Sequence, residues 1–585
     1  MKNSLLENGS PAFVIVANTD SAQSQYAARE LRYYFGMMTG KVFEIVSADA
    51  PVEKTMKRLI LNQVTDASLG DDGFCLQPSE TAFTITGGIR GVIYGSYELL
   101  ERMGCRFFTP RDEKVPYDPA VVLPDEEIRQ VPILEYRLHN TIDFERYQKF
   151  SVKQRINGVT IKEKFGGSMR YAWFVHSMDQ VIPQKEFGKT HPEYFSMRDG
   201  KRYVPENPLL GQRCLTNPDV LKIAIERVRA ALKSHPECRI ISISQMDNCC
   251  NCTCPECAKV DQEEGSSSGT MIRFINAIAT ALKDEFPQVI FDTLAYQYTR
   301  PAPTKTRPVE NVCVRLCSIE CCFSHPMESC DDTTRGVEHP DGTHSSFVTD
   351  LQDWGKMCNR MYIWDYVTCF SHYPTPHPNW HTLQPNMQMF VKNHAKGVFE
   401  QGNSKLGGGP DLIELRQYII AKLLWDPYCD VEKHITEFLD YYYGKAAQYV
   451  REYIETICEK CEKDNIHVGF NDAPVQDFVS EEMLSVYEAI LNKAEKAVQD
   501  DPVKWIRIKR IQFCPWYLRL KRRAKLEGKI DAEELNRFFT EWRSYGFTRI
   551  HEWVDAEFAH QAFLRDMWRG EEMLNHWTAE AEEIL

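Results

Sequence analysis

The amino-acid sequence predicts an α/β protein in which a (β/α)8 TIM-like barrel follows a small α/β sandwich domain and precedes an α-helical domain. Three observations support this fold class. The first region mixes strand and helix patterns, the middle alternates short apolar strands with helical segments, and the last region consists of long charged amphipathic helices. Strands that alternate with helices are typical of a parallel barrel. We therefore expect domains at residues 1–127, 128–429 and 430–585.

The first region begins with a buried-strand pattern, AFVIVAN, at residues 12–18. Residues 22–39 then repeat apolar side chains at helical spacing and end at Gly40, and a second helical pattern covers residues 91–103. These elements predict a small α/β domain. Further strand patterns lie between the two helices, at residues 41–46, 58–64, 73–79 and 82–88.

Eight apolar runs in the second region are the predicted barrel strands. The middle ones show little polar alternation, which is consistent with burial on both faces beneath an outer ring of helices. Eight strands are the number that closes a barrel of this type. The runs lie at residues 134–140, 157–161, 172–177, 239–245, 289–299, 312–320, 360–367 and 396–402.

Composition and charge narrow the classes of partner. The chain has 585 residues and a formal net charge of −14, which argues against nucleic acid as the main partner because phosphate binding needs a basic face. No run approaches the roughly 18 apolar residues of a membrane span. The opening MKNSLLENGSPAFVIVANTD lacks the apolar core of a signal peptide. We therefore expect a cytoplasmic protein without a membrane partner, or a secreted one if the chain is a processed form.

Active sites of parallel barrels lie at the C-terminal ends of the strands, so the residues directly after each apolar run are the most informative. Four runs deliver a carboxylate there, namely Asp247, Glu320, Asp365 and Glu400. Glu320 and Glu400 have apolar neighbours, where a charge is costly unless it is used or paired. The residues that accompany these acids are aromatic, imidazole or amide side chains: His139, Asn140, His176, Gln245, Tyr296, Tyr298, Trp364, Tyr366 and Gln401.

This mixture of side chains indicates a carbohydrate site with an oligosaccharide or glycan as its partner. Aromatic faces stack on pyranose rings, amides bind hydroxyl groups, and paired acids protonate the leaving group and stabilise an oxocarbenium-like transition state. A single acid at a strand end is more often a helix cap or a solvated loop group, and His139 and His176 are at least as often core residues as ligands. Four acids together favour catalysis.

Cysteines gather directly after Asp247. Cys249 or Cys250 could add a fourth ligand to a zinc site here, and His325 is a more distant alternative. Zinc, a local disulfide and reduced buried thiols all remain open for this cluster. No motif for a catalytic zinc, a nucleotide or another catalytic cofactor is present, so we expect none. The three residues that form the C-x-C-x-x-C pattern of the predicted structural zinc site are Cys252, Cys254 and Cys257.

Several longer motifs resemble a known enzyme family. The segment IRGVIYGSYELLERMGCRFFTP resembles the end of the accessory α/β domain of α-glucuronidases and β-hexosaminidases. The segments SQMDNCCNCTCPECAKVDQEEGSSSGTMIRFIN, LAYQYTRPAP, VRLCSIECCFSHP, WDYVTCF and GVFEQG resemble the successive motifs of glycoside hydrolase family 163. The resemblance covers roughly two-thirds of the chain, and the motifs are specific only in combination.

This resemblance implies a retaining endo-β-N-acetylglucosaminidase that acts on N-glycans by a substrate-assisted route. In that route the acetamido oxygen of the substrate attacks the anomeric carbon. We hypothesise that Glu320 is the general acid/base, that Asp247 or Asp365 orients the acetamide, and that Glu400 and Gln401 hold the sugar. The reverse assignment of Asp247 and Glu320 is also consistent with the motifs.

Two other functions are compatible with the sequence. One is an α-glucuronidase-like inverting hydrolase, in which Asp365 and Glu400 would activate water. The other is a carbohydrate-binding protein that has lost catalysis. Retention of all four acids argues against the second alternative.

Overall fold

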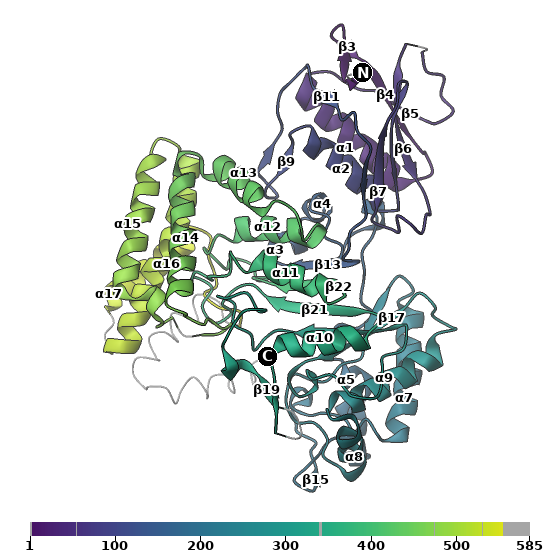
Figure 1. The fold of residues 1–585 in the computed structure, drawn as a ribbon, viewed down its shortest axis with the longest axis vertical. Coiled ribbons are helices and arrows are strands. Elements are labelled where there is room, and N and C mark those ends of the chain that lie inside the picture. Colours follow the sequence, from purple (N-terminus) through teal and green to yellow (C-terminus); the bar gives the residue numbers. More distant parts are fainter. Residues whose placement is uncertain (1–2, 54, 339–341, 473, 529–530, 554–585) are drawn as a thin grey trace.

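The computed structural model describes residues 3–53, 55–338, 342–472, 474–528 and 531–553, and Figure 1 shows three regions in chain order. An N-terminal α/β sheet region is followed by a parallel α/β core and then by a helical region. The helices of the last region stand beside the core (Figure 1). The predicted order of an α/β region, a parallel core and a helical region is therefore confirmed. The predicted helical domain extends to residue 585, and residues 554–585 lie outside the described part.

The N-terminal region is a six-stranded sheet in the order β12-β7-β8-β6-β4-β5. Two helices pack on it, α1 (Ala22–Thr39) and α2 (Gly91–Arg102). Helix α1 begins at the Ser21 cap and ends at Gly40, whose φ of 71° favours glycine. The strands are β4 (Phe13–Ala17), β5 (Ile45–Val46), β6 (Lys57–Gln63), β7 (Phe74–Pro78), β8 (Ala82–Gly87) and β12 (Ile128–Gln130).

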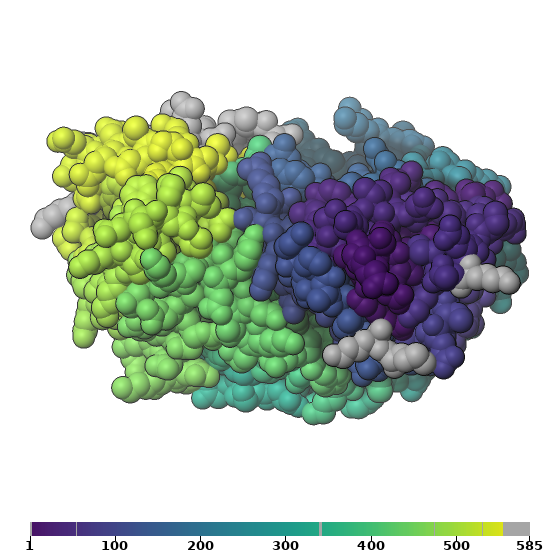
Figure 2. All heavy atoms as spheres, turned by 90° about the horizontal axis from the view of Figure 1, so that it is seen from above, coloured from purple at the N-terminus to yellow at the C-terminus, as the bar shows by residue number. Residues whose placement is uncertain are grey.

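Short strand pairs border this sheet and connect it to the core. The ion pair between Arg106 and Glu437, with an N···O distance of 2.7 Å, joins this border to the helical region. Figure 2 shows the N-terminal residues and the C-terminal helices on the same face of the molecule, at its two ends. The short strands are β1 (Asn3–Ser4), β2 (Leu6–Glu7), β3 (Ser10–Pro11), β9 (Arg106–Phe107), β10 (Glu113–Lys114) and β11 (Val122–Leu123).

The core sheet contains six parallel strands in the order β13-β22-β21-β18-β17-β16. The first strand of the core pairs with the last one, so the sheet curls as a barrel wall does. Its strands are β13 (Tyr136–Asn140), β16 (Ile240–Ser242), β17 (Ile290–Ala295), β18 (Val312–Cys317), β21 (Met361–Tyr366) and β22 (Ala395–Gln401).

Two predicted barrel strands, at residues 157–161 and 172–177, are wrong as regular strands. The first runs close to β13 at Gly158. Only glycine fits there, since a Cβ would lie 2.6 Å from the Leu138 Cβ. The second bonds to the edge of β16 in its first two residues, where the Ala172 amide donates to the Ile240 carbonyl at 2.8 Å and the Ser242 amide donates to the Trp173 carbonyl at 2.9 Å. The wall between β13 and β16 is therefore irregular.

Helices cover the outer face of this sheet, and polar and aromatic side chains fill its interior. Arg315 of β18 is buried and donates to Asp292 of β17 at 3.2 Å, with the rings of Tyr136 and Tyr362 around its guanidinium. The interior is therefore packed rather than hollow at this level. The longer helices are α7 (Pro218–Ser234), α8 (Pro255–Glu264), α9 (Ser268–Leu282), α10 (Phe347–Met357), α11 (Leu383–Lys392) and α12 (Ile413–Trp425).

Several short elements complete the core. They lie mostly in the loops between its strands and helices. They are α3 (Ile142–Arg146), α4 (Gln148–Lys153), α5 (Met178–Val181), α6 (Gln184–Phe187), β14 (Met197–Arg198), β15 (Lys201–Arg202), β19 (Val337–Glu338) and β20 (His344–Ser345).

The helical region packs each helix against the next one in the chain. Gly444, with a φ of 56°, separates the first two helices of a segment that has helical spacing throughout. None of the helices in the described part of the chain combines the length and apolar character that a membrane crossing requires. The helices are α13 (Val431–Tyr443), α14 (Ala447–Lys463), α15 (Glu481–Ala497), α16 (Pro502–Glu527) and α17 (Ala532–Ser544).

Candidate active site

Asp247 and Glu320 lie at the C-terminal end of the core sheet, in the loops after β16 and β18. Asp247 is exposed and accepts a hydrogen bond of 2.9 Å from the hydroxyl of Tyr296, which directly follows β17. The next residue, Gln297, donates from Nε2 to the same hydroxyl at 3.0 Å and has a left-handed φ of 50°. Non-glycine residues hold this conformation at an energetic cost, which is common at functional loops.

Arg300 fixes the Glu320 side chain by a charged hydrogen bond. The Arg300 Nη1 donates to Glu320 Oε2 at 3.0 Å, its Nε donates to Asp350 of α10 at 2.7 Å, and its Nη2 donates to the Ser345 carbonyl at 2.8 Å. The Arg300 side chain has no exposed surface, whereas the Glu320 side chain is 26% exposed. The glutamate is therefore fixed at its base and still open to a ligand.

The two acids influence the same phenols. Burial raises the pKa of Tyr296 above its usual range, and the negative charges of Asp247 and Glu320 add to this rise. Burial also raises the pKa of Tyr366, and the same two carboxylates contribute. Both hydroxyls therefore remain protonated at neutral pH, and both lie within electrostatic reach of Asp247 and Glu320.

An aromatic wall stands beside these acids. Trp364 stacks on Tyr366 with ring centroids 6.3 Å apart and planes 20° apart, and its Nε1 donates to Gln401 Oε1 at 2.8 Å. Phe174 lies 5.9 Å from Trp364 and is 41% exposed. Exposed aromatic faces next to carboxylates suit the apolar face of a sugar ring. Phe174 was not predicted from the sequence, although it lies inside the predicted run 172–177.

The region around Asp247, Glu320 and the aromatic wall is called the candidate mouth here. Three predicted residues lie at this mouth or next to it. His176 bonds through Nδ1 to the Gln245 carbonyl at 2.8 Å, and its ring centroid lies 6.1 Å from that of Tyr296. Gln245 is buried and donates to Thr299 Oγ1 at 2.6 Å, so its side chain supports the loop rather than lining the opening. Asn140 donates to Glu145 Oε1 at 3.2 Å at the end of β13.

Asp365 and Glu400 do not join Asp247 and Glu320. They are register partners on β21 and β22, and each alternates with aromatic or amide neighbours that line the mouth. Because successive side chains of a strand point to opposite faces, both acids point to the helix-covered side of the sheet. They are only 4% and 2% exposed. The expectation that four carboxylates gather in one site is therefore corrected to two.

Burial governs the protonation of this separate pair. It raises the pKa of Asp365 to about 6, although the Ser318 hydroxyl, 2.5 Å away, donates to the carboxylate and opposes the rise. Burial, together with the charge of Asp365, raises the pKa of Glu400 well above its usual range. His139 is the register partner of Glu400 on β13, is fully buried, and has its pKa lowered to about 3 by burial and by Arg416 of α12.

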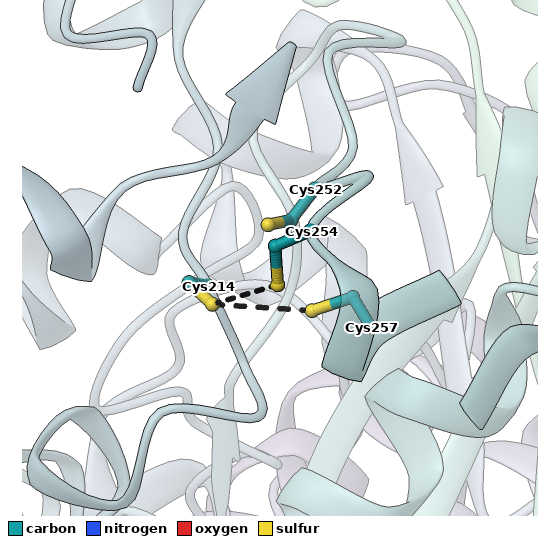
Figure 3. Close-up of side chains that lie close together, drawn as sticks. All are labelled: Cys214, Cys252, Cys254 and Cys257. Atoms are coloured by element: carbon teal, nitrogen blue, oxygen red, sulfur yellow. Dashed lines mark hydrogen bonds between the residues drawn. The ribbon is translucent and has the colours of Figure 1, made fainter. Parts of the chain in front are cut away.

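The predicted cysteines form a buried cluster with one thiol that the sequence did not reveal (Figure 3). Cys214, in the loop before α7, lies 3.7 Å from Cys254 and 3.9 Å from Cys257 between sulfur atoms, and Cys252 completes the group. A disulfide requires about 2.05 Å, whereas a tetrahedral zinc ion with Zn–S bonds of about 2.3 Å separates its sulfurs by about 3.8 Å. These four thiols could hold a structural zinc ion.

The fourth ligands suggested by the sequence lie elsewhere. Cys249 is exposed and donates to Gln297 Oε1 at 3.2 Å, Cys250 is not part of the four-cysteine cluster, and His325 belongs to a different group of side chains. Tyr298, predicted to bind substrate, lines a small cavity next to Cys252 and Cys257 instead of the mouth. Tyr296, two residues earlier, is the tyrosine that donates a hydrogen bond to Asp247.

A separate cleft of about 900 Å³ lies at the opposite end of the core, between the strand starts and the N-terminal sheet. Arg90, Glu163 and Arg239 are among its lining residues. None of the residues predicted to bind or transform a substrate lines this cleft.

Comparisons with solved structures found matches at low sequence identity and low TM-score. An enzyme of glycoside hydrolase family 138 that targets pectin rhamnogalacturonan II has 10% identity and a TM-score of 0.44, over 91% of this chain and 73% of that one. A family 20 β-N-acetylhexosaminidase from Streptomyces coelicolor A3(2) has 12% identity and a TM-score of 0.40, over 77% and 93%. A family 89 enzyme from Clostridium perfringens, in complex with GlcNAc-α-1,4-galactose, has 11% identity and a TM-score of 0.48, over 90% and 65%.

No curated protein matches the chain in sequence. A family model does match, over residues 107–455, which includes the whole core sheet from β13 to β22 and both loops that carry Asp247 and Glu320. This match covers more than half of the chain. The chain therefore belongs to the family described as domain of unknown function DUF4838.

Proposed function

We propose that the chain is a glycoside hydrolase whose reaction takes place between Asp247 and Glu320. The observation that carries this proposal is the combination of two carboxylates around Tyr296 with the aromatic wall of Trp364 and Phe174. Both acids follow core strands at their C-terminal ends, where parallel barrels hold their active sites. A pair of acids beside aromatic rings is the minimum equipment for cleaving a glycosidic bond.

For the substrate, we propose N-glycan-type oligosaccharides and a retaining endo-β-N-acetylglucosaminidase reaction. The resemblance of the barrel motifs to those of glycoside hydrolase family 163 supports this choice. In this route the acetamido oxygen bonds to the anomeric carbon, the bond to the leaving oxygen breaks, and one carboxylic acid protonates that oxygen. Water then opens the cyclic intermediate, and the same carboxylate accepts its proton.

The geometry favours one distribution of roles. Glu320 is the acid/base in this proposal, and Asp247 orients the acetamide with the help of the Tyr296 hydroxyl, which already contacts it. Asp365, the other acid considered for orientation, is buried behind β21 together with Glu400. The same burial argues against the inverting alternative, which needs Asp365 and Glu400 to activate water.

The test is incubation of the full chain with a panel of N-glycans and uronic-acid-capped xylo-oligosaccharides, with products identified by mass. We expect cleavage between the two core N-acetylglucosamines. Release of a terminal glucuronic acid would overturn the proposed reaction in favour of the inverting one. Binding of glycans without any hydrolysis would overturn it in favour of a non-catalytic carbohydrate-binding protein.

We also propose that Cys214, Cys252, Cys254 and Cys257 bind a structural zinc ion. Their spacing supports tetrahedral coordination, and the Met197 amide donates to Cys252 Sγ at 3.2 Å, as backbone amides do around metal-bound thiolates. Four protein ligands leave no open position, so this ion would stabilise the loop after Asp247 and take no part in the chemistry.

A further inference from the structure

A second group of metal-ligand side chains joins the loop after β18 to the segment between α14 and α15. Cys322, His325 and Cys330 come from the loop, and His467 comes from the segment. One ligand atom from each residue lies within 4.8 Å of those of the other three. Residues separated by more than a hundred positions in the chain therefore converge on one point.

The measured distances fit a tetrahedral site. The Cys322 sulfur lies 3.4 Å from His325 Nδ1, and the Cys330 sulfur lies 3.6 Å from His467 Nδ1. Zinc bonds of about 2.3 Å to sulfur and about 2.0–2.1 Å to nitrogen give a sulfur-to-nitrogen edge of about 3.6 Å. The two imidazole centroids are 4.6 Å apart with planes at 49°, so the rings do not block each other.

The surroundings also suit a metal. Asp331 Oδ1 lies 3.2 Å from His467 Nε2, which leaves Nδ1 of that ring directed to the cluster. A carboxylate on the far nitrogen is the usual support of a metal-bound histidine. His325 directs Nδ1 to the Cys322 sulfur, so this nitrogen is the ligand atom that its ring offers to the cluster.

Backbone contacts hold the two segments in place without a metal. The Phe323 amide donates to the Val468 carbonyl at 2.8 Å, and the Val468 amide donates to Ser324 Oγ at 3.1 Å. The site is thus built into a docked interface. Cys322 is buried, whereas the His467 side chain remains 20% exposed, so an ion can enter from that side.

We propose that Cys322, His325, Cys330 and His467 form a second structural zinc site, of the Cys2His2 type, that fastens the β18 loop to the helical region. The consequence for activity rests on the proposed function. Glu320 belongs to the same loop, and Phe470 of the other segment packs on Tyr366 with centroids 5.7 Å apart. The ion would therefore brace two sides of the candidate mouth.

The test measures zinc per chain in the purified full-length protein by mass spectrometry of the metal. We expect two equivalents in the wild type and one in the double variant Cys322→Ser/Cys330→Ser. The variant Cys214→Ser/Cys257→Ser should lose the other equivalent, and Cys429→Ser, a half-buried cysteine outside both clusters, should lose none. His467→Cys should keep two, because it replaces one zinc ligand by another.

Cobalt substitution provides a second readout for variants that fold poorly. Cobalt-substituted Cys214→Ser/Cys257→Ser, which keeps only the second site, should give the visible spectrum of a two-thiolate, two-imidazole site. A wild type without zinc after expression with added zinc, or one whose zinc content is unchanged in Cys322→Ser/Cys330→Ser, would overturn the proposal. So would a disulfide between Cys322 and Cys330 found by peptide mapping. Metal content is read without any glycan, so its outcome is separate from that of the hydrolase test.

Discussion

Replacing Arg300 by methionine tests whether one buried guanidinium organises the candidate mouth. Its partners differ in exposure, since the Asp350 side chain is 2% exposed and that of Glu320 is 26% exposed. Breaking a buried ion pair costs about 3–5 kcal/mol, because the remaining charge keeps its desolvation cost. A pair with a partly exposed member contributes about 1 kcal/mol or less. We therefore expect the free energy of unfolding to fall by up to about 3–5 kcal/mol, mainly through Asp350, which keeps its other contacts.

Thermal unfolding measures this loss. For domains of 150–250 residues, 1 kcal/mol corresponds to about 2–4 °C, so the melting temperature of Arg300→Met should fall on the order of 10 °C. Adding Asp350→Asn should restore part of the fall, because it removes the buried charge. The control is Arg229→Met, whose pair with Glu285 is 32% and 40% exposed and should change the melting temperature little. A melting temperature for Arg300→Met equal to that of the control would refute the reasoning.

Three further predictions concern the acids and the aromatic wall. Glu320→Gln should lower hydrolysis of a glycan by about 10²–10⁴-fold but spare an aryl glycoside with an acidic leaving group, whereas Asp247→Asn should impair both; the opposite pattern in the rates would exchange their roles. Trp364→Ala should raise KM about tenfold, and exposed Trp553→Ala should leave it unchanged. Because burial raises the pKa of Asp365 to about 6 and that of Glu400 well above its usual range, unfolding releases protons above about pH 4. The melting temperature should therefore fall as pH rises from about 4 through 6, and it should change less with pH in Asp365→Asn/Glu400→Gln. The same dependence of melting temperature on pH in this variant would contradict the assignment.

The sequence predicted most of the core strands because their apolar runs are long. It predicted Asp247 and Glu320 as site residues because the C-terminal ends of parallel strands meet at one edge of the sheet. Asp365 and Glu400 satisfy the same rule and yet point away, because a strand buried on both faces hides its parity and an offset of one residue reverses the face. The face becomes clear only from the structure. Asp365 and Glu400 are register partners, and each lies one position along its strand from a side chain of the opposite face, Trp364 or Gln401.

Other parts of the site depend on contacts that no local pattern records. Arg300 reaches Glu320 from the previous loop, and Cys214 reaches Cys254 from the far side of α7. His325 and His467 show the same limit, since the spacing of CCFSHPMESC suggests ligands but does not reveal the fourth one. The irregular stretches at 157–161 and 172–177 were predicted as strands because their apolar content is that of a strand. In the structure neither stretch is a regular strand, and Gly158 in the first one packs so closely on Leu138 that a Cβ would clash.

Each of the two candidate acids precedes a loop that contributes to a thiol cluster. Asp247 precedes the loop that ends at Cys252 and Cys257, and Glu320 precedes the loop that contains Cys322. Loops at a barrel mouth are mobile unless something fixes them, and a general acid misplaced by about 1 Å can lose about 10²-fold in rate. A metal in each cluster would restrain both loops without approaching the reacting atoms. Removal of the metals should therefore lower kcat while the bond that is cleaved stays the same, and a change of the cleaved bond would point to a metal within the active site itself.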